Sequence, residues 1–119
     1  MDSMDAIQVH DQYAADYDRL SLDFGYVLPD ALFGLCSEFL QPGKRLLDIG
    51  IGTGLSSVPF ARAGMAVYGL DGSVEMLKVC EEKKIAVELK PWDIRTAPWP
   101  YADKFFAAVI ECGTIHFLP

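Results

Sequence analysis

The sequence is short of cysteine and histidine and has no long apolar run. Cys36, Cys80 and Cys112 are odd in number and far apart, without the paired spacing that a zinc site or a small disulfide scaffold needs. We therefore expect reduced thiols in a core and no metal site. The first residues are acidic, no apolar run follows them, and no stretch is long enough to span a bilayer. These absences predict a cytoplasmic protein without a signal peptide or a membrane span.

Positive charge is also scarce. Ten lysines and arginines stand against 17 aspartates and glutamates, which gives a formal net charge of −7. Because the two signs are interleaved along the chain, neither a nucleic-acid backbone nor an anionic membrane is expected as the main partner. A cationic or zwitterionic small molecule suits this charge better.

A chain of 119 residues, 51% of them hydrophobic, fits one globular domain. The turn signal at 41–43 divides it into two differently patterned regions. Apolar residues between 28 and 40 recur with the spacing of an amphipathic helix. We expect residues 1–42 to form a helical segment that covers a core built from residues 43–119.

After position 43, short apolar strands alternate with helical stretches, a pattern typical of βαβ units and a parallel sheet. Ser73 is expected to cap one of these helices, and Pro59 falls in the first turn of another, where N–H groups have no partner. The predicted fold is α/β, with three layers in the order αβα. The expected strands are 45–49, 66–70, 85–90 and 105–111, and the expected helices are 56–63 and 74–83.

The last two strands differ in pattern. Residues 105–110 are apolar without alternation, as in a strand that is covered on both faces in the middle of a sheet, whereas residues 85–90 alternate, as nearer an edge. A middle strand needs two neighbours, and only four strands are predicted. We therefore expect a sheet that is incomplete after its fourth strand.

The glycines of Asp48-Ile-Gly50-Ile-Gly52-Thr-Gly54 lie where the first strand ends, which is where open α/β sheets bind ligands. Glycines allow a tight turn and close approach of the backbone to a ligand. The dinucleotide fingerprint G-x-G-x-x-G would need its third glycine at Leu55. Taken by itself, the pattern leaves a ligand-binding turn and a merely structural turn open.

Asp71 ends the second strand, about 20 residues past this turn, where an acidic side chain in such folds accepts the hydroxyl groups of a ribose. An ionised carboxylate only accepts hydrogen bonds, so it suits two adjacent hydroxyls and repels a 2′-phosphate. The alternative is an Asp-Gly pair, with Gly72, that only forms a turn.

Three segments in this order resemble class I, Rossmann-like methyltransferases that use S-adenosylmethionine. They are the D-x-G-x-G-x-G turn at 48–54, the D-x-S-x-x-M-L segment at 71–77, and Asp93 followed by Pro98-Trp99 and Phe105. The family often has Asp where this chain has Ala107. The resemblance implies S-adenosylmethionine as cofactor, S-adenosylhomocysteine as product, and a small-molecule methyl acceptor.

The resemblance also implies a role for individual residues. Asp48 could accept from loop N–H groups or from the cofactor's ammonium, directly or through water, and the resemblance favours the cofactor. The glycines would let the backbone approach the cofactor, and the turn after Glu111 would line its methionine part. Asp71 and Gly72 would hold the ribose. Asp93 would accept from the adenine amino group, the Ile94 N–H would serve a ring nitrogen, and Met76 or Leu77 would pack on the ring. The alternative for Asp93 is a structural one, in which it caps a helix or a turn. The implied cofactor-binding residues are Asp48, Gly50, Gly52, Gly54, Asp71, Gly72, Met76, Asp93, Ile94 and Glu111.

Three further residues have two interpretations each. Tyr13 and Tyr17 resemble the Y-x-x-x-Y-D segment that folds over the cofactor as a lid, and they could equally be a helix face that packs on the core. His116 is a candidate general base toward the acceptor or a structural residue near the mouth of the site.

The sequence therefore predicts a methyltransferase that transfers a methyl group from S-adenosylmethionine to a small molecule. One alternative is a cofactor-binding domain without catalysis that associates with itself through an exposed fourth strand. A second alternative is an NAD-dependent oxidoreductase, which the missing third glycine of the fingerprint disfavours.

Overall fold

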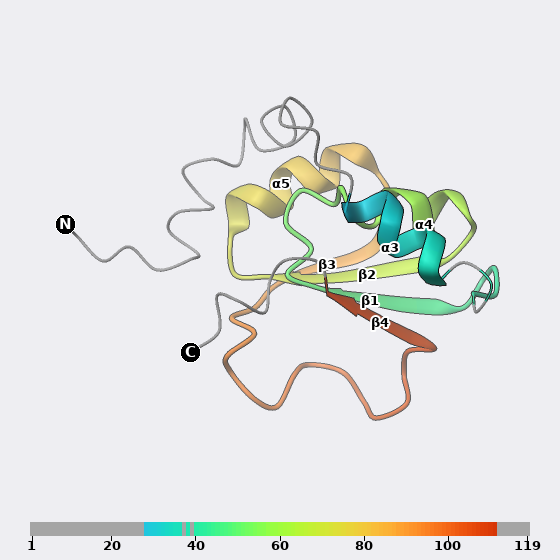
Figure 1. Cartoon of the computed structure of the whole chain (residues 1–119). Coiled ribbons are helices and arrows are strands. Elements are labelled where there is room, and N and C mark those ends of the chain that lie inside the picture. Colours follow the sequence, from blue (N-terminus) through green and yellow to red (C-terminus); the bar gives the residue numbers. More distant parts are fainter. Residues whose placement is uncertain (1–27, 37, 39, 112–119) are drawn as a thin grey trace.

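The computed structural model describes residues 28–36, 38 and 40–111 (Figure 1). Its strands form one parallel sheet in the order β3-β2-β1-β4, which confirms the predicted α/β class. The elements are α3 (Leu28–Cys36), β1 (Arg45–Ile49), α4 (Val58–Arg62), β2 (Ala66–Asp71), α5 (Val74–Lys83), β3 (Ala86–Pro91) and β4 (Ala108–Glu111).

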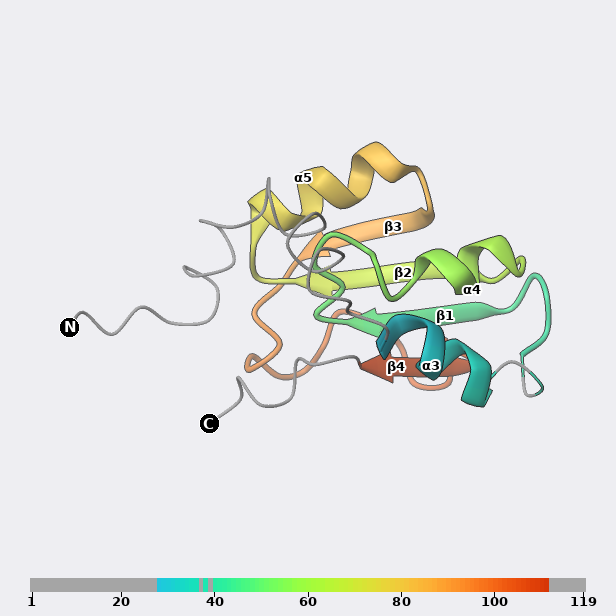
Figure 2. The same ribbon diagram turned by 45° about the horizontal axis from the view of Figure 1, so that its top comes forward.

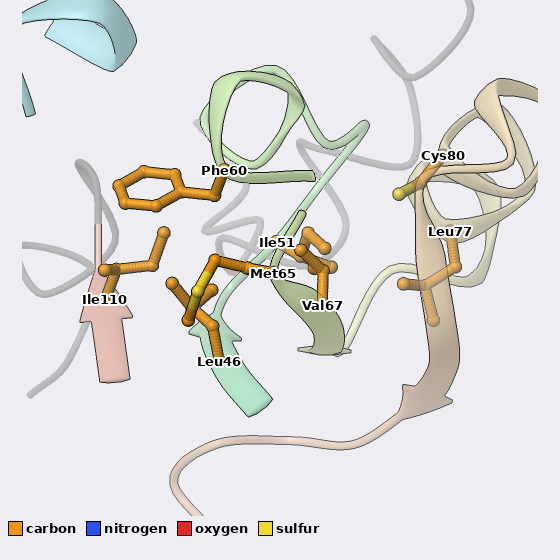
Figure 3. Packing of buried hydrophobic residues seen from close by; sticks show 8 residues of the cluster. All are labelled: Leu46, Ile51, Phe60, Met65, Val67, Leu77, Cys80 and Ile110. Carbon is orange, nitrogen blue, oxygen red and sulfur yellow. The ribbon is translucent and has the colours of Figure 1, made fainter. Parts of the chain in front are cut away.

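The three described helices lie on one face of the sheet, and the connection at 92–107 runs along the other (Figures 1 and 2). The described residues thus supply two of the three predicted layers, the sheet and one layer of helices. Apolar side chains of β1, β2 and β4 meet those of α4 and α5 between these layers (Figure 3). The core consists of Leu46, Ile51, Phe60, Met65, Val67, Leu77, Cys80 and Ile110.

Aromatic side chains cover part of the opposite face. The Tyr68 ring lies 5.5 Å from the Phe105 ring and 5.4 Å from the Phe106 ring, measured between centroids. The Arg45 guanidinium lies 4.0 Å from the Phe105 centroid, and Tyr101 packs on both phenylalanines. This cluster takes the place of a helical layer over the described part of that face.

The predicted fourth strand at 105–111 is therefore too long, because β4 begins only at Ala108. Consecutive side chains of a strand point to opposite faces. Phe105 and Phe106 both contact Tyr68, so they cannot belong to one extended strand. Their apolar character reflects packing on one face rather than burial on two.

β4 lies at an edge of the described sheet, as expected for a fourth strand that is left exposed. Within the described part of the chain, β4 has β1 as its one neighbour, and Val109 is 55% exposed. The predicted edge position of β3 is confirmed. Val87 is the extra residue of a bulge, since Ala86 pairs with Val67 and Glu88 pairs with Tyr68.

The helix termini follow the predicted local chemistry. The Ser73 hydroxyl accepts a hydrogen bond from the Met76 N–H at 3.2 Å and caps α5, while Lys84 ends that helix in the left-handed conformation. Pro59 falls in the first turn of α4, as expected, but α4 covers only Val58–Arg62 of the predicted 56–63. None of the helices that the structure describes is long and apolar enough to cross a membrane.

Candidate functional site

The glycine turn lies at the carboxyl end of the sheet, directly after β1. The N–H groups of Gly50 and Ile51 both donate to the carbonyl oxygen of Leu70, at 2.8 and 3.0 Å. These bonds anchor the start of the turn on β2. The turn therefore occupies the edge of the sheet at which open α/β folds bind ligands.

All three glycines of the turn have positive φ, at 69° for Gly50, 58° for Gly52 and 90° for Gly54. At Gly54 a β-carbon would also lie 2.8 Å from Cys80 Sγ and 2.9 Å from Ile85 Cδ1. At Gly52 the same atom would meet nothing closer than 4.0 Å. Gly54 therefore packs on protein, whereas the half-buried Gly52 has its nearest such neighbours, Asp71 Oδ2 and the Gly50 carbonyl oxygen, at 4.0 Å, which leaves room for a ligand to approach its backbone.

Asp71 joins the glycine turn to the start of α5. Its Oδ2 accepts from the Gly52 N–H at 2.8 Å, and its Oδ1 accepts from the Ser73 N–H at 2.8 Å. The side chain is 6% exposed. An ionised carboxylate only accepts hydrogen bonds, so Asp71 offers acceptors and no donor to a ligand at this edge. The structure thus brings Asp71 and the glycine turn together, as the sequence predicts.

Asp48 lies beneath the turn and is 1% exposed. The Ser57 hydroxyl donates to its Oδ2 at 2.6 Å. Burial raises the pKa of Asp48 from its ordinary 3.8 to about 7; the Ser57 hydrogen bond opposes this rise, and the nearby carboxylates of Asp71 and Glu111 add to it. A cation bound at this edge would therefore be attracted most strongly once Asp48 is ionised.

Glu111 comes to the same edge from β4, where it pairs in register with Ile49. Three acidic residues from three adjacent strands, Asp48, Asp71 and Glu111, thus lie close enough for their charges to interact at this edge of the sheet. Their arrangement favours a positively charged ligand group over an anionic one.

Asp93 follows β3 and closes a local turn. Arg95 donates to its carboxylate from Nε at 2.8 Å, from Nη2 at 2.6 Å and from its backbone N–H at 3.0 Å. The Arg95 side chain lowers the pKa of Asp93, because its hydrogen bonds stabilise the ionised carboxylate. The neighbouring Ile94 presents its carbonyl oxygen to the Trp99 indole at 3.0 Å. The turn-forming interpretation of Asp93 thus has direct contacts, and its adenine role remains a prediction.

Of the other predicted site residues, two are described by the structure and three are not. Gly72 lies between Asp71 and Ser73 at the edge of the site, whereas Met76 is 1% exposed and faces the interior. Tyr13, Tyr17 and His116 lie outside the described residues. Within those residues, no three histidine, cysteine or acidic side chains form a group that could hold a metal ion.

Three supporting residues were missed by the sequence reasoning. A β-carbon at Gly69 would lie 2.6 Å from Ile51 Cδ1, so this glycine lets the Ile51 side chain pack on β2. Ser57 holds Asp48, and Lys83 Nζ donates to the Thr53 carbonyl oxygen at 2.8 Å. An unexplained glycine inside a strand was a usable signal for Gly69.

Comparison with known proteins agrees with this geometry. A family model described as a methyltransferase domain matches residues 46–119. A demethylmenaquinone methyltransferase of Renibacterium salmoninarum is 43% identical over 68 residues, which are 57% of this chain and 28% of that protein. Another protein of that name, from Tropheryma whipplei, is 31% identical over 106 residues, 87% of this chain and 44% of that protein. The chain spans less than half the length of these two curated relatives.

The fold is also found among solved structures. A magnesium protoporphyrin IX methyltransferase from Synechocystis PCC 6803, with bound S-adenosylmethionine, superimposes with a TM-score of 0.70 at 22% identity. The match covers 100% of this chain and 67% of that chain. Because the family model spans more than half of the sequence and includes the glycine turn, the chain belongs to the methyltransferase domain family and has the Rossmann-like fold of class I S-adenosylmethionine-dependent methyltransferases.

Proposed function

We propose that this protein binds S-adenosylmethionine and transfers its methyl group to a small molecule. The observation that carries the proposal is the contact between the glycine turn and Asp71, in which the Gly52 N–H donates to Asp71 Oδ2 at 2.8 Å. An acceptor-only carboxylate beside the backbone of a glycine turn, at the carboxyl end of a parallel sheet, suits the hydroxyl groups of a ribose and supports this proposal.

The charge of the site fits this cofactor. S-adenosylmethionine carries a sulfonium and an ammonium group, and the carboxylates of Asp48, Asp71 and Glu111 lie around the turn that would receive them. The sulfonium supplies an already activated methyl group, so the protein's part is chiefly to align the acceptor and exclude water. We assign Asp71 to the ribose and Asp48 to the ammonium, directly or through water.

Asp93 and Ile94 are proposed to read adenine. In that role Asp93 would accept from the adenine amino group while it shares its oxygens with Arg95, which now holds both of them. Tyr13 and Tyr17 are proposed as a lid, and His116 as a general base for acceptors that must lose a proton.

The relatives suggest which acceptor to test first. Both are named for methyl transfer to demethylmenaquinone, so we propose a quinone of this type as the candidate substrate. We also propose a cytoplasmic location, and self-association of the 119-residue chain through the open edge of β4.

Calorimetric titration with S-adenosylmethionine and S-adenosylhomocysteine tests the cofactor. We expect binding by the wild type, a large loss of affinity in Asp71→Ala, and no change in Asp103→Asn, an exposed carboxylate elsewhere in the chain. Tighter binding of NAD than of S-adenosylmethionine would overturn the proposal in favour of an oxidoreductase. Release of S-adenosylhomocysteine in the presence of demethylmenaquinone then tests the acceptor.

A further inference from the structure

The glycine turn has a second anchor, on the side of α5. Lys83, in the last turn of α5, donates from Nζ to the carbonyl oxygen of Thr53 at 2.8 Å, and 30 residues separate the two in sequence. The Gly54 N–H of the same peptide unit donates to the Ile51 carbonyl oxygen at 3.0 Å. Both the carbonyl and the N–H group of the Thr53–Gly54 peptide are therefore hydrogen-bonded, and the donor to the carbonyl is a charged ammonium.

The packing around this peptide leaves it little freedom. The closest atoms to a β-carbon placed on Gly54 are Cys80 Sγ and Ile85 Cδ1, which flank Lys83 in the sequence. We call Cys80, Lys83 and Ile85 the α5 seat. The seat contacts the turn at Thr53 and Gly54, while Asp71 holds it at Gly52.

The two anchors have opposite polarity. A carboxylate accepts from an N–H group of the turn, and an ammonium donates to a carbonyl group one residue later. Hydrogen bonds with one charged partner are shorter and about twice as strong as neutral ones. Together they fix the orientations of the Ile51–Gly52 and Thr53–Gly54 peptide units on either side of the Gly52–Thr53 peptide. The glycines at 52 and 54, at φ of 58° and 90°, would otherwise allow many orientations.

We propose that Lys83 is a positioning residue for the cofactor site, whose ammonium fixes the Thr53–Gly54 peptide and thereby the conformation of the glycine turn that binds the cofactor. This inference rests on the proposed function. Lys83 does not touch the cofactor in this assignment; it acts through the backbone of Thr53. Its place in the last turn of α5 also suits the helix dipole, but a dipole effect alone would not alter ligand affinity.

The test compares substitutions at two lysines of α5. Lys83→Met keeps the aliphatic stem and removes the ammonium, Lys83→Arg keeps a charged donor, and Lys78→Met removes an exposed lysine of the same helix that contacts only Glu75 among the described contacts. S-adenosylhomocysteine is titrated into each variant of the 119-residue chain. We expect about tenfold weaker binding for Lys83→Met, the loss of one charge-assisted hydrogen bond, near-wild-type binding for Lys83→Arg, and no change for Lys78→Met.

A spectroscopic signature separates positioning from general stability. In the absence of ligand, the Gly54 amide resonance is expected to shift in Lys83→Met and to stay in place in Lys78→Met. If Lys83→Met does not fold, Lys83→Gln, which keeps a neutral donor, is expected to fold and to bind with intermediate affinity.

The two proposals fail in different ways. Absence of S-adenosylhomocysteine binding by the wild type overturns the proposed function and this inference with it. Wild-type binding together with unchanged affinity in Lys83→Met, or in Lys83→Gln where Met does not fold, overturns only the role of Lys83.

Discussion

Replacing Asp48 by asparagine is expected to change how the stability of the chain depends on pH. Asp48 is buried, and its pKa is about 7 in the folded chain against an ordinary 3.8. Between these two values the folded chain keeps the proton that the unfolded chain releases. Unfolding then releases a proton, so the contribution of Asp48 to stability falls as pH rises from about 4 to about 7 and is constant above that range.

The magnitude follows from the size of the shift. Raising the pKa from 3.8 to about 7 corresponds to about 4 kcal/mol of destabilisation above pH 7, relative to pH below 4. Asparagine carries no charge, and its side-chain oxygen still accepts from the Ser57 hydroxyl. Asp48→Asn should therefore match the wild type near pH 4 and exceed its stability by up to about 4 kcal/mol at pH 8.

Urea denaturation followed by circular dichroism measures this difference at pH 4, 5, 6, 7 and 8. The gap between Asp48→Asn and wild type is the useful quantity, because groups that do not interact with Asp48 contribute equally to both chains, while the coupling of Asp48 to Asp71 and Glu111 belongs to the gap itself. The exposed Asp103→Asn variant should show no gap that grows with pH. A gap of equal size at pH 4 and pH 8 would refute the argument that Asp48 titrates within a buried site.

The same substitution should weaken cofactor binding, since the proposed ammonium partner has lost its charge. Saturating S-adenosylhomocysteine, at about 100 times the dissociation constant, should stabilise the wild type by about 3 kcal/mol at pH 8 and the variant by much less. A variant that is more stable alone and less stabilised by ligand would identify Asp48 as a residue retained for binding at the expense of stability.

Three further substitutions test other parts of the structure. Gly54→Ala should destabilise the chain by about 2 to 4 kcal/mol, because the new β-carbon meets Cys80 and Ile85. Gly43→Ala, at φ of 85° and with nothing within 4 Å, should destabilise it by only about 1 to 2 kcal/mol, from backbone strain. Equal losses of stability for the two variants in urea denaturation would contradict the clash at Gly54. Ser73→Ala removes the cap of α5 and should lose about 1 kcal/mol, and Ser73→Asp should recover most of it in the same assay. Val109→Lys places a charge on the open edge of β4 and should shift sedimentation toward the monomer, and a wild type that already sediments as a monomer would contradict self-association through β4.

Sequence patterns predicted the strands and helices best where the pattern reflects the element itself and not its contacts with another element. The bounds of β1 and α5 agree with prediction at both ends, since β1 is a short apolar run and α5 is bounded by a capping serine and a left-handed C-cap. The prediction was wrong at residues 105–107, where apolar character arises from contacts with Tyr68 on another strand. An apolar run does not say whether one face or two are covered.

The same holds in the candidate site, where residues of short motifs could be predicted and residues that act through tertiary contacts could not. Asp71 and the glycines belong to short motifs whose backbone geometry is local, and the structure brings them within hydrogen-bond distance. Lys83 and Gly69 support the turn from α5 and β2, and neither belongs to a motif that faces a ligand. Their roles follow only from the way the chain brings separate elements together.

This division bears on how cofactor affinity can vary within one fold. In its proposed role Asp71 accepts from the two hydroxyl groups of a ribose, a chemistry for which few other side chains can substitute. Residues of the α5 seat act on the turn through packing and one charged hydrogen bond, which other side chains can supply in part. Substitutions at Lys83 should therefore grade the affinity for S-adenosylhomocysteine in the order Lys, Arg, Gln, Met, whereas substitutions at Asp71 should abolish it. A graded series at Lys83 beside a sharp loss at Asp71 is the pattern expected if one residue shapes the turn and the other binds the ligand.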